Sequence, residues 1–393
     1  MFYPVHLNLQ NRRCLVVGAG TVAERKVLSL LHSGGDVTLI SPEATAQIKK
    51  LAQAERIQWH GRQFHSGDTE GMFLVCAATD DSGINTQVFK EANQAHGIKL
   101  VNVVDVIPEC TFAAASVVRY GDLMLSISTS GKSPAMSRRI REYLEAKFET
   151  TSLYADPDDT DFTPPPRGQG LPYPVYFLLE DRRCVVISGS ENMDEALAQR
   201  VDLLQRSGAS VEQIDSTVPN LINRLSDAFL VLVDDTDFYP GTALADVLYQ
   251  IPLIEYVGVP EIGTFATPRL VMDGDLIISV STDYVQKNSE TEKEDDKIKH
   301  VQIELARQFE NNGHGKFIDF LGSLRPLVIR AIPTQKGRQR FFDDLIDQVP
   351  GNGTQKCCLG FEKKDCSIEC AFNLIRNGQF ECVYQWANEQ IST

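Results

Sequence analysis

The chain has 393 residues, of which 42% are hydrophobic and 23% charged, as is typical of a soluble protein with roughly two to four domains. Its net charge of −15 argues against nucleic acid as the main partner, and no apolar run approaches the ~20 residues of a membrane span. The start lacks the basic-then-apolar order of a secretory signal, and nine unevenly spaced cysteines do not resemble a disulfide framework, so we expect a cytoplasmic protein.

The first 112 residues alternate between strand and helix patterns. Strands are predicted within the segments 13–20, 33–41, 72–81 and 98–105. A helix from about residue 21 carries apolar side chains at helical spacing. This alternation predicts a parallel sheet of the α/β class, with a ligand at the carboxyl ends of its strands.

Gly18-x-Gly20-x-x-Ala23 follows the first of these strands and opens the helix. In this context the motif is the dinucleotide fingerprint, with Gly18 for the tight turn, Gly20 for the approach of a pyrophosphate and Ala23 for close helix packing. A glycine turn without a ligand is the alternative. The second strand ends in Ser41-Pro42-Glu43, without the usual acid at its end and without an arginine for a 2′-phosphate, which favours NAD over NADP.

Two clusters of basic residues contain no acid. Residues 130–141 hold Lys132, Arg138, Arg139 and Arg141, and residues 325–340 hold five further cations. In an acidic chain, such clusters predict a polyanionic ligand, with Ser128, Thr129, Ser130 and Ser133 as additional donors. A solvated basic helix face is the alternative for each cluster.

The chain contains an internal duplication. Residues 2–17 match residues 172–187 at an offset of 170, and residues 111–129 match residues 264–282 at an offset of 153, so the second copy is 17 residues shorter. Gly18 and Gly20 become Ser188 and Ser190, and Asp105 aligns with Gly258. The second copy therefore keeps apolar positions but lacks the two glycines, the Asp105 carboxylate and the cationic segment of the first.

Four motifs of the first copy, GAGTVAERK, AATDDSGIN, VNVVDVIPECTF and GDLMLSISTSGKSPAMSRRIREYLE, resemble the precorrin-2 dehydrogenase / sirohydrochlorin ferrochelatase family, the N-terminal module of siroheme synthase. The resemblance covers residues 1–150 and resumes loosely near 296–393. It implies a Rossmann-type NAD-binding domain, an α+β dimerisation arm and a helical domain. One departure is Phe112-Ala-Ala-Ala115, where the family commonly has F-x-x-P.

The resemblance implies that Asp105, which ends the last predicted strand, is the catalytic residue. A carboxylate beside the nicotinamide crevice suits a general base, whereas capping of the next turn is the alternative. The predicted cofactor-binding residues are Gly18, Gly20, Thr21, Val22, Ala23, Ser41, Pro42, Glu43, Ala78, Thr79, Asp80 and Asn102, and the predicted substrate-binding residues are Ser128, Thr129, Ser130, Lys132, Ser133, Arg138 and Arg338.

The predicted organisation has six parts. They are an NAD-binding domain (1–112), a dimerisation and substrate arm (113–152), a linker (153–170), a degenerate Rossmann-like repeat (171–265), a degenerate arm (266–295) and a helical domain (296–393). Because the family forms homodimers, the second copy is expected to pair with the first within the chain, and a homodimer is the rival. The C-terminal cysteines include no C-x-x-C pair, so no metal site is predicted and buried structural thiols are expected, with metal or cluster binding as the alternative. They are Cys357, Cys358, Cys366, Cys370 and Cys382.

The leading functional hypothesis is NAD-dependent oxidation of precorrin-2 to sirohydrochlorin, with Fe²⁺ insertion as a second step. One rival is a dehydrogenase without chelatase activity. Another is a non-catalytic, NAD-responsive scaffold of the tetrapyrrole pathway. The sequence by itself does not separate the two enzymatic alternatives.

Overall fold

The computed structural model describes residues 1–104, 106–120, 123–148, 172–189, 195–215, 221–235, 248, 251–259, 262–282, 291–347, 371–376, 378, 380, 383, 384 and 387. These residues form two compact units. The first, here called the paired Rossmann unit, comprises Phe2–Ala114 and Asp156–Thr267. The second, here called the arm unit, comprises Met1, Ala115–Ala155 and Pro268–Thr393. Each unit therefore combines segments from both sequence copies.

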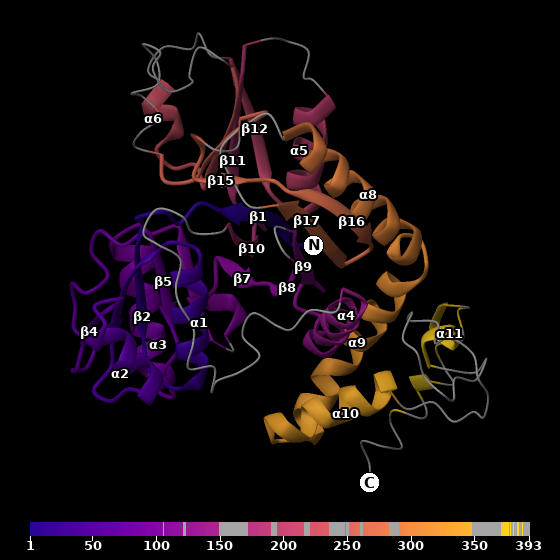
Figure 1. The fold of residues 1–393 in the computed structure, drawn as a ribbon, viewed down its shortest axis with the longest axis horizontal. Coiled ribbons are helices and arrows are strands. Elements are labelled where there is room, and N and C mark those ends of the chain that lie inside the picture. Colours follow the sequence, from indigo (N-terminus) through magenta and orange to yellow (C-terminus); the bar gives the residue numbers. More distant parts are fainter. Residues whose placement is uncertain are drawn as a thin grey trace. The chain divides into compact units, whose positions relative to one another are not determined.

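The first copy forms a five-stranded parallel sheet in the order β4-β3-β2-β5-β6 (Figure 1). Every residue of β5 and β6 is buried, as expected for strands in the interior of an α/β fold. Its elements are β2 (Arg13–Val17), α1 (Thr21–His32), β3 (Asp36–Ile40), α2 (Ala46–Gln53), β4 (Gln58–His60), β5 (Leu74–Ala77), α3 (Ser82–Phe89), the π-helical turn η1 (Lys90–Ala95), β6 (Leu100–Val103) and the 3-10 turn η2 (Ile107–Glu109). The predicted α/β class is confirmed.

The second copy forms a four-stranded parallel sheet in the order β12-β11-β13-β14. Its elements are β11 (Arg183–Ser188), α5 (Glu195–Arg206), β12 (Ser210–Asp215), α6 (Leu221–Leu225), β13 (Leu230–Asp234) and β14 (Ile254–Tyr256). This order repeats β3-β2-β5-β6. Helix α6 follows β12 as α2 follows β3 but is shorter, and no strand described between β12 and β13 corresponds to β4. Most of the shortening seen in the sequence falls in this segment.

A third sheet joins the two copies in the order β15-β1-β10-β7. Its strands are β1 (Tyr3–Leu7), β7 (Phe112–Ala114), β10 (Tyr173–Phe177) and β15 (Phe265–Ala266). β1 and β10 lie side by side and antiparallel, with Val5 opposite Val175, its own equivalent at the offset of 170 (Figure 1). β1 also pairs with β15 of the second copy, and β10 pairs with β7 of the first. The copies are thus related by a local two-fold axis and exchange their edge strands.

The arm unit repeats this symmetry in a sheet of order β16-β17-β9-β8. Its strands are β8 (Ser116–Tyr120), β9 (Leu123–Ser128), β16 (Arg269–Asp273) and β17 (Leu276–Thr282). β9 pairs antiparallel with β17, and Ser126 lies opposite Ser279, its equivalent at the offset of 153. The two hydroxyls are 2.6 Å apart and buried. Strand pairing between the copies therefore occurs within one chain.

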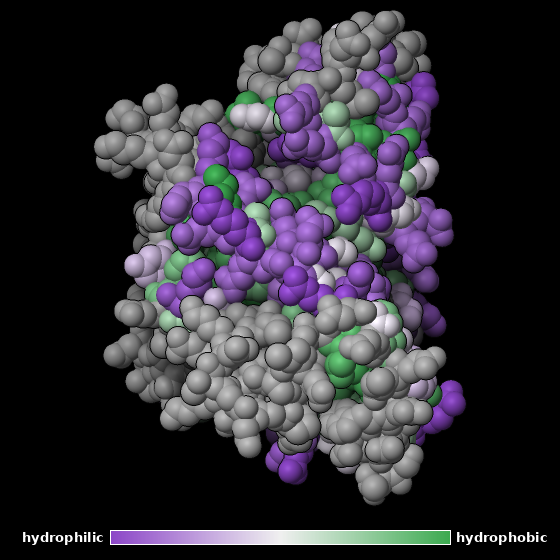
Figure 2. Space-filling model, turned by 90° about the vertical axis from the view of Figure 1, so that its right-hand side faces the viewer, coloured by the Kyte–Doolittle hydropathy of each residue, from purple (hydrophilic) through white to green (hydrophobic). Residues whose placement is uncertain are grey.

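Helices complete the arm unit. They are α4 (Pro134–Lys147), α8 (Thr291–Phe309), α9 (His314–Ala331), α10 (Gln335–Asp347) and α11 (Ala371–Arg376). Ser133 caps α4 by accepting a hydrogen bond from the Met136 amide (3.3 Å). One apolar cluster includes Leu125, Ile278, Phe309 and Leu321, so both copies share a core with the helices. The described side chains on the face in Figure 2 are mostly hydrophilic, as expected for the outer side of amphipathic helices.

Candidate cofactor and substrate site

The turn after β2 requires glycine at position 18. Gly18 has φ +103°, which side chains disfavour, and a Cβ at this position would collide with the carbonyl group of Ala78. The Gly18 amide donates to the Ile40 carbonyl (2.9 Å), and the Ala78 amide donates to the Val17 carbonyl (2.8 Å). The turn is therefore held between the carboxyl ends of β3, β2 and β5.

Helix α1 begins with an open N-terminus. Its N-cap is Gly20, which provides no capping side chain, and a Cβ added to Gly20 would have no neighbour within 4 Å. Thr21 and Val22 are exposed, whereas Ala23 is fully buried. Backbone amides at such a helix end have no intrahelical acceptor and attract anions. The residues of this turn therefore fit a dinucleotide pyrophosphate.

The predicted adenosine side of the site lies after β3. The Ser41 amide donates to the His60 carbonyl (3.2 Å), and the Trp59 indole donates to the Ser41 carbonyl (3.0 Å). Pro42 and Glu43 are exposed, so the Glu43 carboxylate is open to solvent just past the strand end. This is the nearest acid after the strand, as the sequence indicated.

The residues after β5 build a rigid polar turn. The Thr79 hydroxyl lies 2.7 Å from Asn85 Oδ1, and the Asn85 amide group donates to the Thr79 carbonyl (2.9 Å). Asp81 caps α3 by accepting hydrogen bonds from the amides at positions 83 and 84. Ala78 is half-buried and Asp80 is exposed. The Thr79 side chain is thus bound within the turn. Asp80 and Asp81 are both exposed, and the Asp81 carboxylate is used in the helix cap.

Asn102 on β6 is bound on both sides of its amide group. Its Oδ1 accepts a hydrogen bond from Lys26 Nζ (2.6 Å), and its Nδ2 donates to the Phe112 carbonyl (3.0 Å). Cys110 lies beside it, and burial raises the pKa of the Cys110 thiol. Asn102 is thus a fixed, buried group near the carboxyl end of β6, the edge strand of the sheet.

Lys26 was not among the predicted site residues. The signal was a cation in the second turn of a helix whose neighbours Ala23 and Val27 are buried, which directs the lysine stem along the sheet. Glu24, a buried carboxylate that accepts a hydrogen bond from the Thr45 hydroxyl, was not predicted either. Both side chains belong to the helix that the fingerprint opens.

Asp105 lies outside the described residues, and its catalytic role stays a prediction. The preceding strand β6 ends at Val103, and the Val104 amide donates to the Ala77 carbonyl (3.0 Å). The carboxyl ends of β6 and β5 therefore lie next to each other at the same edge of the sheet. The turn that follows is closed by hydrogen bonds of the Cys110 thiol to the carbonyls of Val103 (3.2 Å) and Val106 (3.3 Å).

The predicted substrate residues lie in the arm unit, and most of their hydroxyls bind their own loop. The Ser130 amide donates to Ser128 Oγ (3.0 Å). Thr129 is buried, donates to the Ser133 carbonyl (2.9 Å) and lies 3.1 Å from Ser137 Oγ. The loop after β9 is therefore closely tied to the start of α4, and these hydroxyls shape it.

The predicted cations of the arm unit have internal partners. Lys132 Nζ contacts Asp275 Oδ2 (2.5 Å) and Asp319 Oδ1 (2.6 Å). Arg138 pairs with Asp343, and Arg338 donates to the carbonyls of Ile332 (3.0 Å) and Pro333 (2.7 Å). The acid-free sequence segment is thus neutralised in part by acids from distant positions in the chain. Its role in substrate binding stays a prediction.

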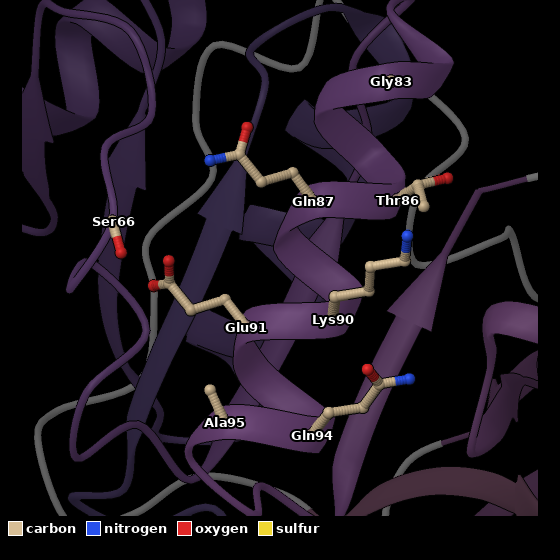
Figure 3. Close-up of a pocket in the computed structure, with 8 residues that line it drawn as sticks. All are labelled: Ser66, Gly83, Thr86, Gln87, Lys90, Glu91, Gln94 and Ala95. Atoms are coloured by element: carbon tan, nitrogen blue, oxygen red, sulfur yellow. The ribbon is translucent and has the colours of Figure 1, made fainter.

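A pocket of about 670 Å³ lies along α3 and η1 (Figure 3). Glu91 points from η1 toward the segment that carries Ser66, and its carboxylate accepts hydrogen bonds from the Gly67 amide (3.0 Å) and the Thr69 hydroxyl (2.9 Å). Thr86 and Lys90 line the same pocket. None of the predicted site residues lines it, so it does not coincide with the predicted cofactor edge.

The remaining features are the C-terminal cysteines, possible metal-ligand groups and possible membrane helices. The cysteines at 357, 358, 366, 370 and 382 lie outside the described residues. Among the residues that the structure describes, no group of three or more His, Cys, Asp or Glu side chains is arranged to hold a metal ion. Within the same part of the chain, no helix is long and apolar enough to cross a membrane.

Comparisons with known proteins agree with the glycine turn. Residues 5–116 match the family described as "Putative NAD(P)-binding", and residues 121–147 match "Sirohaem biosynthesis protein central". Both matches lie within the first 150 residues, the part of the chain that is similar to siroheme synthases. The predicted resemblance is confirmed for this part of the chain.

The individual relatives match the same part of this chain. The chain is 39% identical over 145 residues to siroheme synthase of Mannheimia succiniciproducens, which is 37% of this chain and 30% of the relative. It is 40% identical over 144 residues to siroheme synthase of Pseudoalteromonas translucida, again 37% and 30%. The chain thus spans about a third of the length of these relatives. Among solved structures, SirC, a precorrin-2 dehydrogenase, has 28% identity and a TM-score of 0.33, over 36% of this chain and 68% of SirC.

Proposed function

We propose that the chain oxidises precorrin-2 to sirohydrochlorin with NAD⁺ as hydride acceptor, and that the first copy carries the reaction. The observation that carries this proposal is the Gly18 turn with its bare helix N-terminus, in a segment that matches siroheme synthases. NAD⁺, when bound, removes a hydride from the substrate. The lack of an arginine after β3 supports NAD rather than NADP.

The protein's own groups have three roles in this proposal. The amides at Thr21 and Val22 bind the pyrophosphate. Asn102, fixed by Lys26, orients the carboxyl edge of β6. Asp105 accepts the proton that leaves when the substrate loses a hydride, so that one hydride and one proton account for the oxidation. The loop after β9, including Ser128 and Ser130, receives the polycarboxylate substrate.

The second copy has a structural role in this proposal. β11 continues through Ser188, where the first copy turns at Gly18, and Asp235 lies so close to Gly189 that a Cβ there would be 2.8 Å from its carboxylate. A carboxylate at this edge repels a pyrophosphate. The chain therefore has one cofactor site and is a pseudo-dimer, supported by the pairing of β1 with β10 and of β9 with β17.

Insertion of Fe²⁺ into sirohydrochlorin is the second proposed reaction, supported by the name siroheme synthase of the relatives. Iron is here a substrate. The reactions are assigned to the cytoplasm, which is supported by the free thiols of Cys14, Cys76, Cys110 and Cys184.

The test is an anaerobic assay of the full chain with precorrin-2 and NAD⁺, followed by absorbance, with Fe²⁺ added last. Formation of sirohydrochlorin that requires both protein and NAD⁺ supports the dehydrogenase. Conversion to siroheme above the rate without protein supports the second reaction, and its absence leaves a dehydrogenase alone. NAD binding without any oxidation would contradict the enzyme proposal and favour the scaffold.

A further inference from the structure

The turn between β16 and β17 belongs to the second copy but contacts the predicted substrate loop of the first. Lys132 of that loop lies 2.5 Å from Asp275 Oδ2 and 2.6 Å from Asp319 Oδ1 on α9. The Ser130 hydroxyl is 3.4 Å from the Asp275 carbonyl oxygen. Asp275 therefore meets the loop through both its side chain and its backbone.

The loop conformation depends on such external contacts. Ser130 has φ +49° and Gly131 has φ +75°, so two consecutive residues adopt the left-handed region, which serine disfavours. The Lys132 amide donates to the Thr129 carbonyl (2.9 Å) and closes the turn, and Arg325 of α9 donates to the Gly131 carbonyl. Conformations of this kind persist where the surrounding structure holds them.

The charges and packing favour a fixed Lys132. Burial raises the pKa of Asp275, but the hydrogen bonds from Lys132 and Ser130, with the charges of Lys132 and the amino terminus, outweigh this effect and hold the pKa below its usual value. The Asp275 side chain is 16% exposed, whereas the Asp319 side chain is 55% exposed. The Lys132 stem packs against α9, where a Cβ on Gly322 would lie 3.1 Å from Lys132 Cβ. Asp275 is therefore the stronger of the two anchors.

We propose that Asp275 of the second copy is a positioning residue for the substrate loop of the first copy. Through Lys132 it holds the loop in its left-handed turn, and Lys132 is a clamp rather than a free cation for a substrate carboxylate. This inference rests on the proposed function. It gives the degenerate copy, which lacks the glycine turn, a direct part in the site.

The experiment is a double-mutant cycle with D275N and K132Q in the full chain, with D319N as the matched control. D275N and K132Q are each expected to raise the KM for precorrin-2 about tenfold, and the double variant no further, because both break the contact between Lys132 and Asp275. D319N, which breaks the exposed pair, is expected to change KM about twofold or less. D275E is expected to recover part of the loss, and NAD affinity is expected to stay the same in all variants.

Three outcomes would overturn the inference. K132Q with a high KM beside a normal D275N would make Lys132 a direct substrate contact. Additive effects of the two substitutions would mean that they act independently. A general loss of thermal stability and NAD affinity in D275N would show a structural role alone.

Hydrogen exchange separates this inference from the proposed function. The Lys132 amide, which is bonded to Thr129, is expected to exchange about tenfold faster in D275N than in D319N, whether or not precorrin-2 is oxidised. An unchanged exchange rate would contradict the clamp even in an active enzyme. If the wild type oxidises no precorrin-2 but the exchange rate rises, the proposed function fails and the clamp stands.

Discussion

The two copies differ most clearly at the carboxyl edge of their sheets. In the first copy, Lys26 Nζ donates to Asn102 Oδ1 (2.6 Å); in the second, Arg200 and Glu255 take the corresponding positions on helix and strand and form an ion pair (2.8 Å). Glu255 is buried and also accepts hydrogen bonds from the amide (3.1 Å) and hydroxyl (2.6 Å) of Thr267. In the second copy, the polar side chains at this edge are thus paired with one another and with Thr267.

The supporting framework is the same in both copies. Thr111 Oγ1 accepts from the Val101 amide (2.8 Å), and Thr264 Oγ1 accepts from the Ile254 amide at the same distance. The Leu178 amide donates to the Thr111 carbonyl (2.9 Å), and the Asn8 amide donates to the Thr264 carbonyl (2.8 Å). The contacts that join the copies are thus retained, whereas the groups at the predicted cofactor edge have changed.

The largest expected effect comes from Asp105→Ala. If the first copy alone is active, this single substitution removes the base and is expected to lower kcat for precorrin-2 oxidation about a thousandfold, with NAD affinity unchanged. Stopped-flow absorbance and NAD titration measure the two quantities. Asp105→Asn is the matched control and is expected to be as inactive. Appreciable activity in either variant would remove Asp105 from the chemistry.

Gly18→Ala sharpens the comparison at the cofactor turn. A Cβ at φ +103° against the Ala78 carbonyl is expected to weaken NAD binding about a hundredfold, measured by calorimetry. The counterpart in the second copy, Ser188→Gly, is expected to leave NAD affinity and a stoichiometry of one unchanged. A second NAD bound per chain would break the comparison.

Glu255→Gln tests the internal ion pair of the second copy. It leaves Arg200, whose side chain is 20% exposed, without its charged partner and is expected to cost about 3 kcal/mol of stability. The midpoint of urea unfolding measures this loss. Lys26→Met in the first copy, which removes only one hydrogen bond to a neutral amide, is expected to cost about 1 kcal/mol. Equal losses would mean that the two edges are equivalent.

The smallest expected effect is at the symmetry axis of the arm unit. Ser126→Ala and Ser279→Ala each remove the hydrogen bond between the two hydroxyls, at about 1 kcal/mol, and the double substitution is expected to cost less than the sum of the two. Thermal unfolding checks this cycle. Fully additive losses would argue against a direct contact between the equivalent serines.

The sequence predicted the features that depend on local geometry. The Gly18 turn, the buried Ala23 and the parallel strands follow from residues close together in the chain, because turn conformation and strand burial are written in the local pattern. The duplication was also visible, since equal spacing of similar residues needs no structure to be recognised.

The partners of the charged side chains could not be predicted in the same way. Lys132 was predicted to be available for a ligand because its segment holds no acid. Its ion-pair partners are Asp275 and Asp319, which are more than a hundred residues away in the sequence. Lys26 was overlooked because Asn102 lies 76 positions further along. Side-chain pairing over such separations depends on how the strands and helices pack.

The sequence by itself determined the α/β class, the glycine turn and the relation between the two copies, because each is encoded by short-range pattern or by repetition. Only the tertiary structure decided that the copies exchange strands about the Val5–Val175 and Ser126–Ser279 pairs, and which carboxylates neutralise the basic loop. The physical reason is that strand edges and charges can be satisfied by any complementary partner, and only the folded chain brings one of them within hydrogen-bonding distance.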